Sequence, residues 1–263
     1  MSAEATPAGA VRCSVEGAVA TFVFDRPAAR NAMTWGMYQQ LEEICQRLPE
    51  TPGVRVAVFR GAGGEAFVAG TDIAQFSDFQ TGDDGVAYER RIDAVIGALE
   101  SLPLPTLAVI DGWTIGGGLA IATACDFRLA TPNSRFGVPI ARTLGNCLSV
   151  ANLARLEAAF GLQNARRMLL LAEVLDAEQA RACGFLERVC EAADLDAAAG
   201  RLCEQLAALA PVTQSVTKEG LRRVVARRVA EGEDLVRRSY GSADFHEGVA
   251  AFVAKRKPVW RGQ

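Results

Sequence analysis

Short apolar runs alternate along this chain with longer segments in which apolar residues recur every three or four positions. Residues 11–15 and 18–24 are rich in β-branched and aromatic side chains and flank a Glu-Gly turn, which predicts an opening β-hairpin. Residues 54–60 and 106–110 predict two buried strands. The segment between those strands has apolar residues at helical spacing, namely Val86, Ile92, Val95, Ile96, Leu99 and Leu102. Strands that alternate with helices in this way predict an α/β architecture.

Polar residues mark where several helices are expected to begin. Thr34 and Asp176 are placed to cap two of them, because their side-chain oxygens can accept from the free N–H groups of a first turn. Asp83 or Asp84 can cap the helix that contains the apolar series given above. Asp72 is interpreted as a helix cap that can also form part of a site wall.

The stretch from Thr106 to Ala130 predicts a buried strand, a glycine turn, a buried helix and a second strand. Gly116-Gly117-Gly118 stands where that helix begins, and the first N–H groups of a helix have no partner within it. These donors and the positive end of the helix dipole suit an anion, including one that exists only in a transition state. Residues 119–125 carry no charge, so the helix is expected to be buried on every side. The alternative is a tight turn with close helix packing.

Two common phosphate-binding motifs do not fit this glycine turn. A dinucleotide fingerprint requires a small third residue, and Ile121 stands at that position. The phosphate-loop pattern G-x-x-x-x-G-K-[ST] does not occur anywhere in the sequence.

The second half of the chain becomes progressively more helical. Residues 135–137 predict a short strand, and residues 138–146, which contain Pro, Gly, Thr and Asn, predict an irregular loop suited to chemistry. Helix is expected from residue 148 onward, interrupted by a short strand at residues 185–189. From about residue 192 the pattern predicts nearly continuous helix.

Composition narrows the class of protein. The 263 residues are half apolar, enough for a sizeable core, and the net charge of −3 without a basic stripe argues against nucleic acid as a partner. The N-terminal ten residues lack a signal-peptide pattern, and no long uncharged apolar run predicts a membrane span, so a cytoplasmic protein is expected. Seven cysteines without C-x-x-C spacing predict buried thiols rather than disulfides or a metal site, namely Cys13, Cys45, Cys125, Cys147, Cys183, Cys190 and Cys203.

Four segments occur in a characteristic order: FDRPAARNAMTWGM, AFVAGTDIAQF, DGWTIGGGLAIATACDFRLATPNSRFG and DFHEGVAAFVAKRKP. Together they resemble the enoyl-CoA hydratase/isomerase (crotonase) superfamily over essentially the full length of the chain. The resemblance implies a crotonase-like β-β-α superhelix in residues 1–193. It also implies a C-terminal helical region, residues 194–263, that builds homotrimers, often paired into hexamers.

The resemblance further implies an acyl-CoA thioester as ligand, so CoA would arrive with the substrate and no separate cofactor is expected. Two backbone N–H groups hold the thioester oxygen in that family, and the matching residues are Thr71 and Gly117. The remaining positions that match substrate contacts are Ala69, Gly70, Asp72, Ile73, Gly116, Ala120, Ile140, Phe252 and Lys255.

The chain also departs from the family pattern. The hydratases use two glutamates to position and deprotonate water, and the corresponding positions here hold Ala120 and Ile140, neither of which can transfer a proton. The candidates that could replace them are Arg142, Thr143, Asn146, Cys147 and Ser149, of which Asn146 is favoured as a donor to an enolate or carboxylate. Cys147 lacks a credible base, because the only histidine, His246, belongs to the tail segment and is interpreted as a surface or packing residue.

Three functions remain open from the sequence. The first is an acyl-CoA enzyme that stabilises a thioester enolate for isomerisation, decarboxylation or atypical hydration. The second is a non-catalytic acyl-CoA-binding or scaffold protein of the same fold. The third is an RNA-binding relative, which the acidic balance disfavours.

Overall fold

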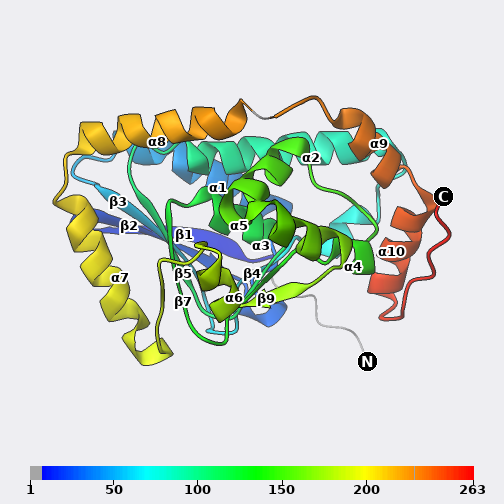
Figure 1. The fold of residues 1–263 in the computed structure, drawn as a ribbon, viewed down its shortest axis with the longest axis horizontal. Coiled ribbons are helices and arrows are strands. Elements are labelled where there is room, and N and C mark those ends of the chain that lie inside the picture. The colour runs from blue at the N-terminus through cyan, green and yellow to red at the C-terminus, as the bar shows by residue number, and fades with distance from the viewer. Residues whose placement is uncertain (1–7, 228) are drawn as a thin grey trace.

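The computed structural model describes residues 8–227 and 229–263 and has the α/β architecture that the sequence predicts (Figure 1). Residues 1–7, which belong to the stretch that lacks a signal-peptide pattern, lie outside the described residues. No helix in the described part of the chain is long and apolar enough to cross a membrane.

The larger sheet has six strands in the order β1-β2-β3-β5-β7-β10. The hairpin of β1 (Ala10–Glu16) and β2 (Val19–Asp25) is antiparallel, as predicted, and the later strands join it in parallel. These strands are β3 (Val56–Gly61), β5 (Thr106–Ile110), β7 (Phe127–Ala130) and β10 (Arg188–Val189).

The smaller sheet has four strands in the order β4-β6-β8-β9. They are β4 (Ala66–Ala69), β6 (Trp113–Ile115), β8 (Arg135–Gly137) and β9 (Val174–Asp176). Each successive pair, β3 and β4, β5 and β6, then β7 and β8, sends its first strand to the larger sheet and its second to the smaller. The helices α2 (Gly82–Glu100) and α3 (Gly117–Ala124) follow the first two pairs, which produces the β-β-α repeat.

The remaining helices cover the strands. Those of the first two thirds of the chain are α1 (Trp35–Arg47), α4 (Ile140–Thr143), α5 (Val150–Leu170) and α6 (Ala177–Ala182), with the short 3-10 helices η1 (Pro27–Ala29), η2 (Leu48–Glu50) and η3 (Ile73–Phe76). The C-terminal helices run around the outside of the strands, from α7 at the left of Figure 1, over α8, to α9 and α10 at the right. They are α7 (Ala192–Ala207), α8 (Pro211–Ala226), α9 (Glu233–Tyr240) and α10 (Ala243–Val253).

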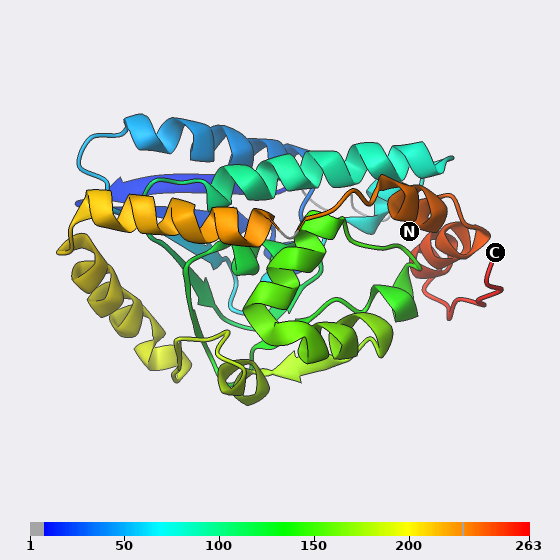
Figure 2. The same cartoon turned by 45° about the horizontal axis from the view of Figure 1, so that its top comes forward.

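Figure 2 shows α8 extending alongside the core, and α9 packs along α2. Helix α7 contributes Leu195 and Ala198 to a cluster with Val56 and Leu107 of the larger sheet. The predicted boundary between residues 193 and 194 therefore falls inside a helix that packs on that sheet, and the division into two regions stays a prediction.

Several predictions of local structure were wrong. The loop predicted at residues 138–146 contains α4, and the strand predicted at residues 185–189 is limited to its last two residues. Strand β6 was not predicted, because its three residues carry no periodic signal and are paired only by β4 and β8. The cap of α2 is Thr81, whereas Asp84 is the third helical residue and accepts from the Thr81 N–H at 2.8 Å to complete a capping box.

The predictions of two helix caps and of a buried helix were confirmed, whereas the prediction for the cysteines was confirmed only in part. Thr34 and Asp176 cap α1 and α6 through their side-chain oxygens. The residues of α3 are buried or half-buried, and His246 is exposed. The prediction that the cysteines are buried holds for Cys45, Cys125 and Cys203, whereas Cys147, Cys183 and Cys190 are half-buried and Cys13 is exposed on the edge strand β1.

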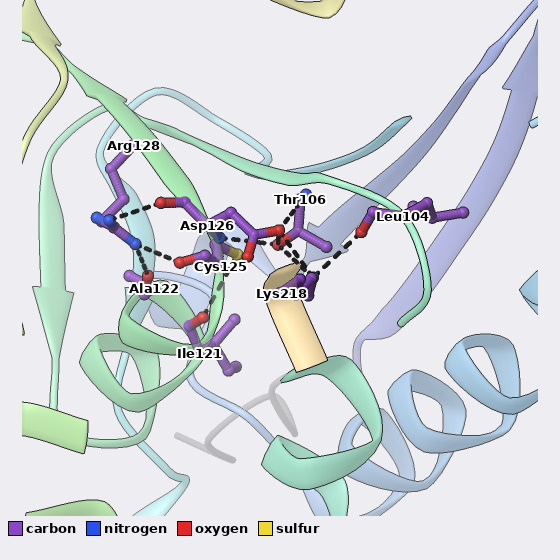
Figure 3. A network of polar contacts seen from close by, with 8 residues as sticks. All are labelled: Leu104, Thr106, Ile121, Ala122, Cys125, Asp126, Arg128 and Lys218. Atoms are coloured by element: carbon purple, nitrogen blue, oxygen red, sulfur yellow. Dashed lines mark hydrogen bonds and ion pairs between the residues drawn. The ribbon is translucent and has the colours of Figure 1, made fainter. Parts of the chain in front are cut away.

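A network of polar contacts holds the C-terminal end of α3 (Figure 3). The Arg128 guanidinium donates to the carbonyl oxygens of Ala122 and Cys125, and to that of Asp126 at 2.9 Å. These contacts satisfy carbonyl groups that have no partner within the helix, and they place a positive charge at the negative end of its dipole. Arg128 therefore helps to fix α3 in the direction that points its N-terminus at the turn of Gly116.

The same network attaches α8 to the core. Lys218 Nζ lies 2.7 Å from Asp126 Oδ2 and donates to Leu104 O at 3.1 Å and to Thr106 Oγ1 at 3.3 Å. Asp126 Oδ2 also accepts from the N–H and the hydroxyl of Thr106, each at 2.8 Å. Because the Lys218 side chain is only 12% exposed, this ion pair is shielded from solvent and anchors the first C-terminal helix beyond α7.

We expect Lys218→Ala to lower the free energy of unfolding by about 3 kcal/mol, because it leaves a partly buried carboxylate without its cation. The control on the same helix is Arg223→Ala, whose ion pair with Glu219 is exposed and should cost less than about 1 kcal/mol. Denaturant unfolding of both variants measures the difference. Equal losses would contradict the assigned role of Lys218.

Candidate functional site

The register of β4 and β6 brings two backbone N–H groups together. The strands are parallel, and Ala69 pairs with Ile115 at their ends. Thr71 and Gly117 each follow two residues later, so both leave the sheet at the same edge. Among the described residues neither the Thr71 N–H nor the Gly117 N–H has a hydrogen-bond acceptor. The structure therefore places the two N–H groups that the resemblance singled out next to each other, with their hydrogen-bonding capacity unused.

Two glycines make this close approach possible. Gly70 has a φ of +99° and Gly116 a φ of +53°, which L side chains rarely adopt. A Cβ added to Gly116 would lie 3.8 Å from the Cα of Gly70, so the two turns are in contact. A Cβ on Gly118 would collide with the carbonyl oxygen of Val68, which explains why α3 can start directly against β4 only with glycine there.

The FDRPAARNAM segment positions β4. Asn31 Nδ2 donates to the carbonyl oxygens of Ala62 at 2.9 Å and Ala66 at 2.8 Å, and Asn31 Oδ1 accepts from the Arg26 N–H at 2.9 Å. Arg26 also forms an ion pair with Asp72 at 2.8 Å. The side chain of Asp72 caps η3 as predicted. These contacts hold both ends of the turn that contains Thr71.

The floor below the two N–H groups is polar and neutral. Thr71 Oγ1 lies 2.8 Å from the hydroxyl oxygen of Tyr38 and 3.0 Å from that of Tyr88. A Cβ on Gly117 would collide with the Tyr38 hydroxyl, so that ring lies directly against the start of α3. Burial raises the pKa of Tyr38 to about 12, and the phenol stays protonated at neutral pH.

The predicted residues of the following segments lie close by in the fold. Ala120 is half-buried in the first turn of α3, and Ile140 begins α4. Asn146 follows α4 and donates from Nδ2 to the hydroxyl oxygen of Tyr240 at 3.0 Å. Its Oδ1 is buried and has no partner in the described part of the chain. A buried amide oxygen without a donor is costly, so this group is a candidate for contact with a ligand.

The remaining predicted residues lie on α10 or next to it. Ile73 begins η3, which contacts α10. Phe252 is 51% exposed near the end of that helix, and Lys255 is exposed just beyond it. The structure therefore brings the residues of the turn at Thr71 together with those of α3, whereas Phe252 and Lys255 stand at the surface.

Glu89 on α2 is a candidate that the sequence analysis missed. It is 4% exposed, and its Oε1 accepts from the Tyr240 hydroxyl at 2.8 Å while its Oε2 accepts from the Ser149 N–H at 2.9 Å. Burial raises the pKa of Glu89 to about 7, and the nearby Asp93 contributes in the same direction, whereas the two hydrogen bonds lower it. The sequence did contain a signal for this residue: Glu89 stands three residues after Val86, so a charged side chain occupies the apolar face of the predicted helix.

Glu89 borders a cleft of about 620 Å³ between α2, the start of α5 and the segment 229–237. The nearby Arg155 is committed to two other carboxylates, Asp93 at 3.2 Å and Glu100 at 3.1 Å. Among the described residues no Lys or Arg forms an ion pair with Glu89. A buried carboxylate without a cation is unusual, and such groups cluster at functional sites.

Aromatic rings cover the space beside Thr71. The Tyr88 ring contacts those of Trp35 at 5.4 Å, Phe76 at 5.0 Å and Tyr240 at 6.0 Å. These rings come from α1, η3, α2 and α9 of one chain, so the C-terminal helices close over the same chain's own turn. The rings form part of a packed apolar cluster that also contains Phe245 and Val249.

Neither a nucleophilic thiol nor a metal cluster emerges. Burial raises the pKa of Cys147 to about 11, so it remains a thiol at neutral pH, and its Sγ contacts the carbonyl oxygen of Leu235 at 3.8 Å. Within residues 8–227 and 229–263 no three His, Cys, Asp or Glu side chains are grouped as metal ligands would be.

The two-sheet architecture with its strand-strand-helix units is the crotonase-like α/β fold. A solved structure of methylmalonyl-CoA decarboxylase matches it with a TM-score of 0.87 at 24% identity, over 96% of this chain and 98% of the other. The family profile for enoyl-CoA hydratase/isomerase matches residues 14–263. The chain therefore belongs to the enoyl-CoA hydratase/isomerase family.

Two relatives indicate the range of that family. The short-chain-enoyl-CoA hydratase of Clostridium acetobutylicum is 28% identical over 246 residues, which cover 92% of this chain and 94% of the relative. The crystal structure of an enoyl-CoA hydratase/carnithine racemase from Magnetospirillum magneticum is 32% identical, with a TM-score of 0.78 and 96% of each chain covered.

The buried Glu89 predicts a characteristic dependence of stability on pH. Its pKa is about 7 when folded against an ordinary 4.5, so the unfolded chain releases the proton first as the pH rises. The destabilisation is therefore absent below about pH 4.5, develops between pH 4.5 and 7, and reaches about 3 kcal/mol above that range. The free energy of unfolding of Glu89→Gln should therefore rise relative to that of the wild type by most of this amount between pH 5 and 8.5. A difference that does not depend on pH is added to it, because an amide replaces the carboxylate that accepts from the Ser149 N–H.

Denaturant unfolding across this pH range measures the difference between the two proteins. The control is Glu231→Gln, which removes an exposed carboxylate from the same cleft without breaking an ion pair and should keep a constant difference from the wild type. Parallel curves for the wild type and Glu89→Gln would show that Glu89 titrates normally.

Proposed function

We propose that this chain is an acyl-CoA-processing enzyme in which the N–H groups of Thr71 and Gly117 hold the thioester oxygen and stabilise an enolate. The observation that carries this proposal is the convergence of two backbone donors that have no protein acceptor among the described residues. CoA is carried by the substrate, and we propose no further cofactor.

The geometry suits charge that develops on an oxygen atom. Both donors belong to the backbone of packed elements, so they need little reorganisation when the enolate forms. The Gly117 N–H lies at the first residue of α3, where the helix dipole adds to the attraction. Prepositioned donors of this kind supply several kcal/mol in a site that excludes water, and the neutral tyrosines below add no opposing negative charge.

The reaction that follows enolate formation is isomerisation, decarboxylation or an atypical hydration. On the resemblance, Ala120 and Ile140 stand where hydratases have their two glutamates, and neither side chain can activate water. Asn146 is proposed to contact the substrate, which its unpartnered Oδ1 supports. The alternative of a non-catalytic acyl-CoA-binding protein is favoured by the same two apolar residues.

We also propose a cytoplasmic homotrimer or hexamer built by the C-terminal helices. None of the residues of α8, all of which are described, is buried, and Val212, Val216 and Leu221 are each more than half exposed. A surface of this kind is usually covered by another copy of the chain. The exposed Phe252 and Lys255 are then available to contact the CoA moiety.

A panel of CoA thioesters followed by mass spectrometry tests the proposed function. We expect turnover of at least one thioester, detected as a shifted double bond, loss of CO₂ or gain of water. Crotonyl-CoA hydration should stay well below the ordinary enzymatic range of about 1–1000 per second, because no carboxylate stands at positions 120 and 140. Binding without turnover of any thioester would favour the non-catalytic alternative.

The assignment of the donors is tested by a pair of variants at one position. Thr71→Pro removes the N–H and should reduce kcat by about 100-fold, as loss of one oxyanion donor does. Thr71→Ser keeps both the N–H and the hydroxyl shared with the tyrosines, so its kcat should stay within about threefold of the wild type. Thermal unfolding confirms that both variants fold, and the infrared carbonyl band of a bound ¹³C-labelled thioester reports polarisation. Equal kcat values and equal bands would disprove the assignment.

A further inference from the structure

We propose that Glu89 is a positioning residue that acts through Tyr240 on Asn146, and that its proton decides whether Asn146 offers the acyl group a donor or an acceptor. This inference rests on the proposed function, since it concerns the acyl group of the same thioester. It assigns to three residues from α2, α9 and the α4–α5 loop a common role in substrate selection.

The three side chains form one continuous hydrogen-bonded chain. Asn146 Nδ2 lies 3.0 Å from the Tyr240 hydroxyl oxygen, which lies 2.8 Å from Glu89 Oε1. Tyr240 has no exposed surface, and Glu89 is 4% exposed, so water does not compete for these bonds along the chain. Glu89 borders the cleft of about 620 Å³, through which a proton can reach it from solvent.

The ionised state of Glu89 sets one direction of donation. A carboxylate can only accept, so the Tyr240 hydroxyl donates to Glu89 and its oxygen is left to accept from Asn146 Nδ2. The amide orientation of Asn146 is then fixed by Tyr240, and its Oδ1 is the buried atom without a partner among the described residues. In this state Asn146 presents an acceptor.

Protonation of Glu89 reverses the direction. The carboxyl group gains one proton from solvent and donates it in a hydrogen bond to the Tyr240 oxygen, while the phenol keeps its own hydrogen. That hydrogen now needs an acceptor, and the only change required is a half-turn of the Asn146 amide, which brings Oδ1 to Tyr240. The two Nδ2 hydrogens then occupy the place where Oδ1 was, so Asn146 presents a donor.

Two packed rings connect this switch to the turn that contains Thr71. The Tyr240 ring packs against the Tyr88 ring at 6.0 Å, and the Tyr88 hydroxyl lies 3.0 Å from Thr71 Oγ1. Tyr88 and Glu89 are consecutive on α2, so one turn of helix contributes to both the floor under Thr71 and the switch. In the proposed site, the acyl group would meet the Asn146 amide beyond these two rings, where its Oδ1 is buried without a partner among the described residues.

The charged groups around Glu89 leave it free to take up a proton near neutrality. Asp93 on α2 is acidic and favours the protonated form of Glu89, and Glu231, Glu233 and Asp234 line the other side of the cleft. The nearby cations have other partners: Arg155 pairs with Asp93, Arg90 with Glu233, and Arg237 with Asp83. Cys147, Tyr38 and Tyr88 also face Glu89, and burial raises the pKa of each, so they are neutral in this range.

The consequence is a selectivity that depends on pH. An acyl group that ends in a carboxylate needs a donor, and it should bind best when Glu89 is protonated. Above neutral pH the binding of such a thioester should therefore draw one proton into Glu89. An acyl group that ends in a methyl group makes no such demand and should bind without proton uptake.

Succinyl-CoA and butyryl-CoA form a matched pair of probes, since they share CoA and a four-carbon chain but differ in a terminal carboxylate. Calorimetric titration at pH 8 in two buffers of different ionisation enthalpy measures proton uptake, and protons exchanged by the shared CoA cancel in the comparison. We expect the wild type to take up close to one more proton with succinyl-CoA than with butyryl-CoA. The ratio of the two affinities should fall about tenfold between pH 7 and pH 8.5.

Three variants connect this uptake to the chain of hydrogen bonds. Glu89→Gln can donate to Tyr240 at every pH, so its affinity ratio should not depend on pH and the extra proton should vanish. Tyr240→Phe keeps Glu89 and the ring but removes the connecting hydroxyl, so the extra uptake should vanish as well. Glu231→Gln removes an exposed carboxylate of the same cleft, leaves the ion pairs of Arg90 and Arg237 in place, and should behave as the wild type.

Equal proton uptake with both thioesters in the wild type would overturn the inference without any variant, as would extra uptake that persists in Tyr240→Phe. If both thioesters bind with equal uptake, the role of Glu89 fails while the proposed function stands. If neither thioester binds, the inference fails, whereas the proposed function is decided by the wider panel of thioesters.

Discussion

The parallel pairing of Ala69 with Ile115 is the constraint on which the candidate site depends. Parallel strands end at the same edge, so the residues that follow them leave the sheet side by side. Glycines at 70, 116 and 118 allow the two chain segments to approach without side-chain collision. Arg128 donates to the C-terminal end of α3, and Asn31 donates to the start of β4. These hydrogen bonds fix the two elements that position the N–H groups.

The polar side chains below the two N–H groups are neutral hydroxyl groups, and the buried carboxyl group of Glu89 bonds elsewhere. The hydroxyl groups of Thr71, Tyr38 and Tyr88 satisfy one another and stay neutral, which keeps negative charge away from the place where an oxyanion would form. Glu89, the one fully buried carboxyl group among the described residues, follows Tyr88 on α2 and connects instead to Tyr240 and the cleft. The C-terminal helices thus contribute to the site as well as enclosing the core, because α9 supplies Tyr240.

Much of the fold could be predicted from local pattern. The opening hairpin, the helix caps at Thr34 and Asp176, and the buried helix after Gly117 follow from periodicity and from the hydrogen-bonding needs of chain ends. The failures have a common cause. Strand β6 and helix α4 are only three and four residues long, too short for a periodic signal, and they exist because neighbouring elements supply their partners.

The sequence by itself determined the α/β class, the glycine-rich helix start and the membership in a family whose motifs occur in order. It also predicted Thr71 and Gly117 as candidate donors, since both stand in segments that resemble the family. Only the tertiary structure showed what lies between and beneath them. Tyr38, Tyr88, Glu89, Asn146 and Tyr240 come from distant parts of the chain, and the hydrogen-bonded Glu89 and Tyr240 are 151 residues apart. Burial, donor direction and the pKa of a carboxyl group depend on such distant neighbours, because each is a property of the surroundings of a side chain rather than of its position in the sequence.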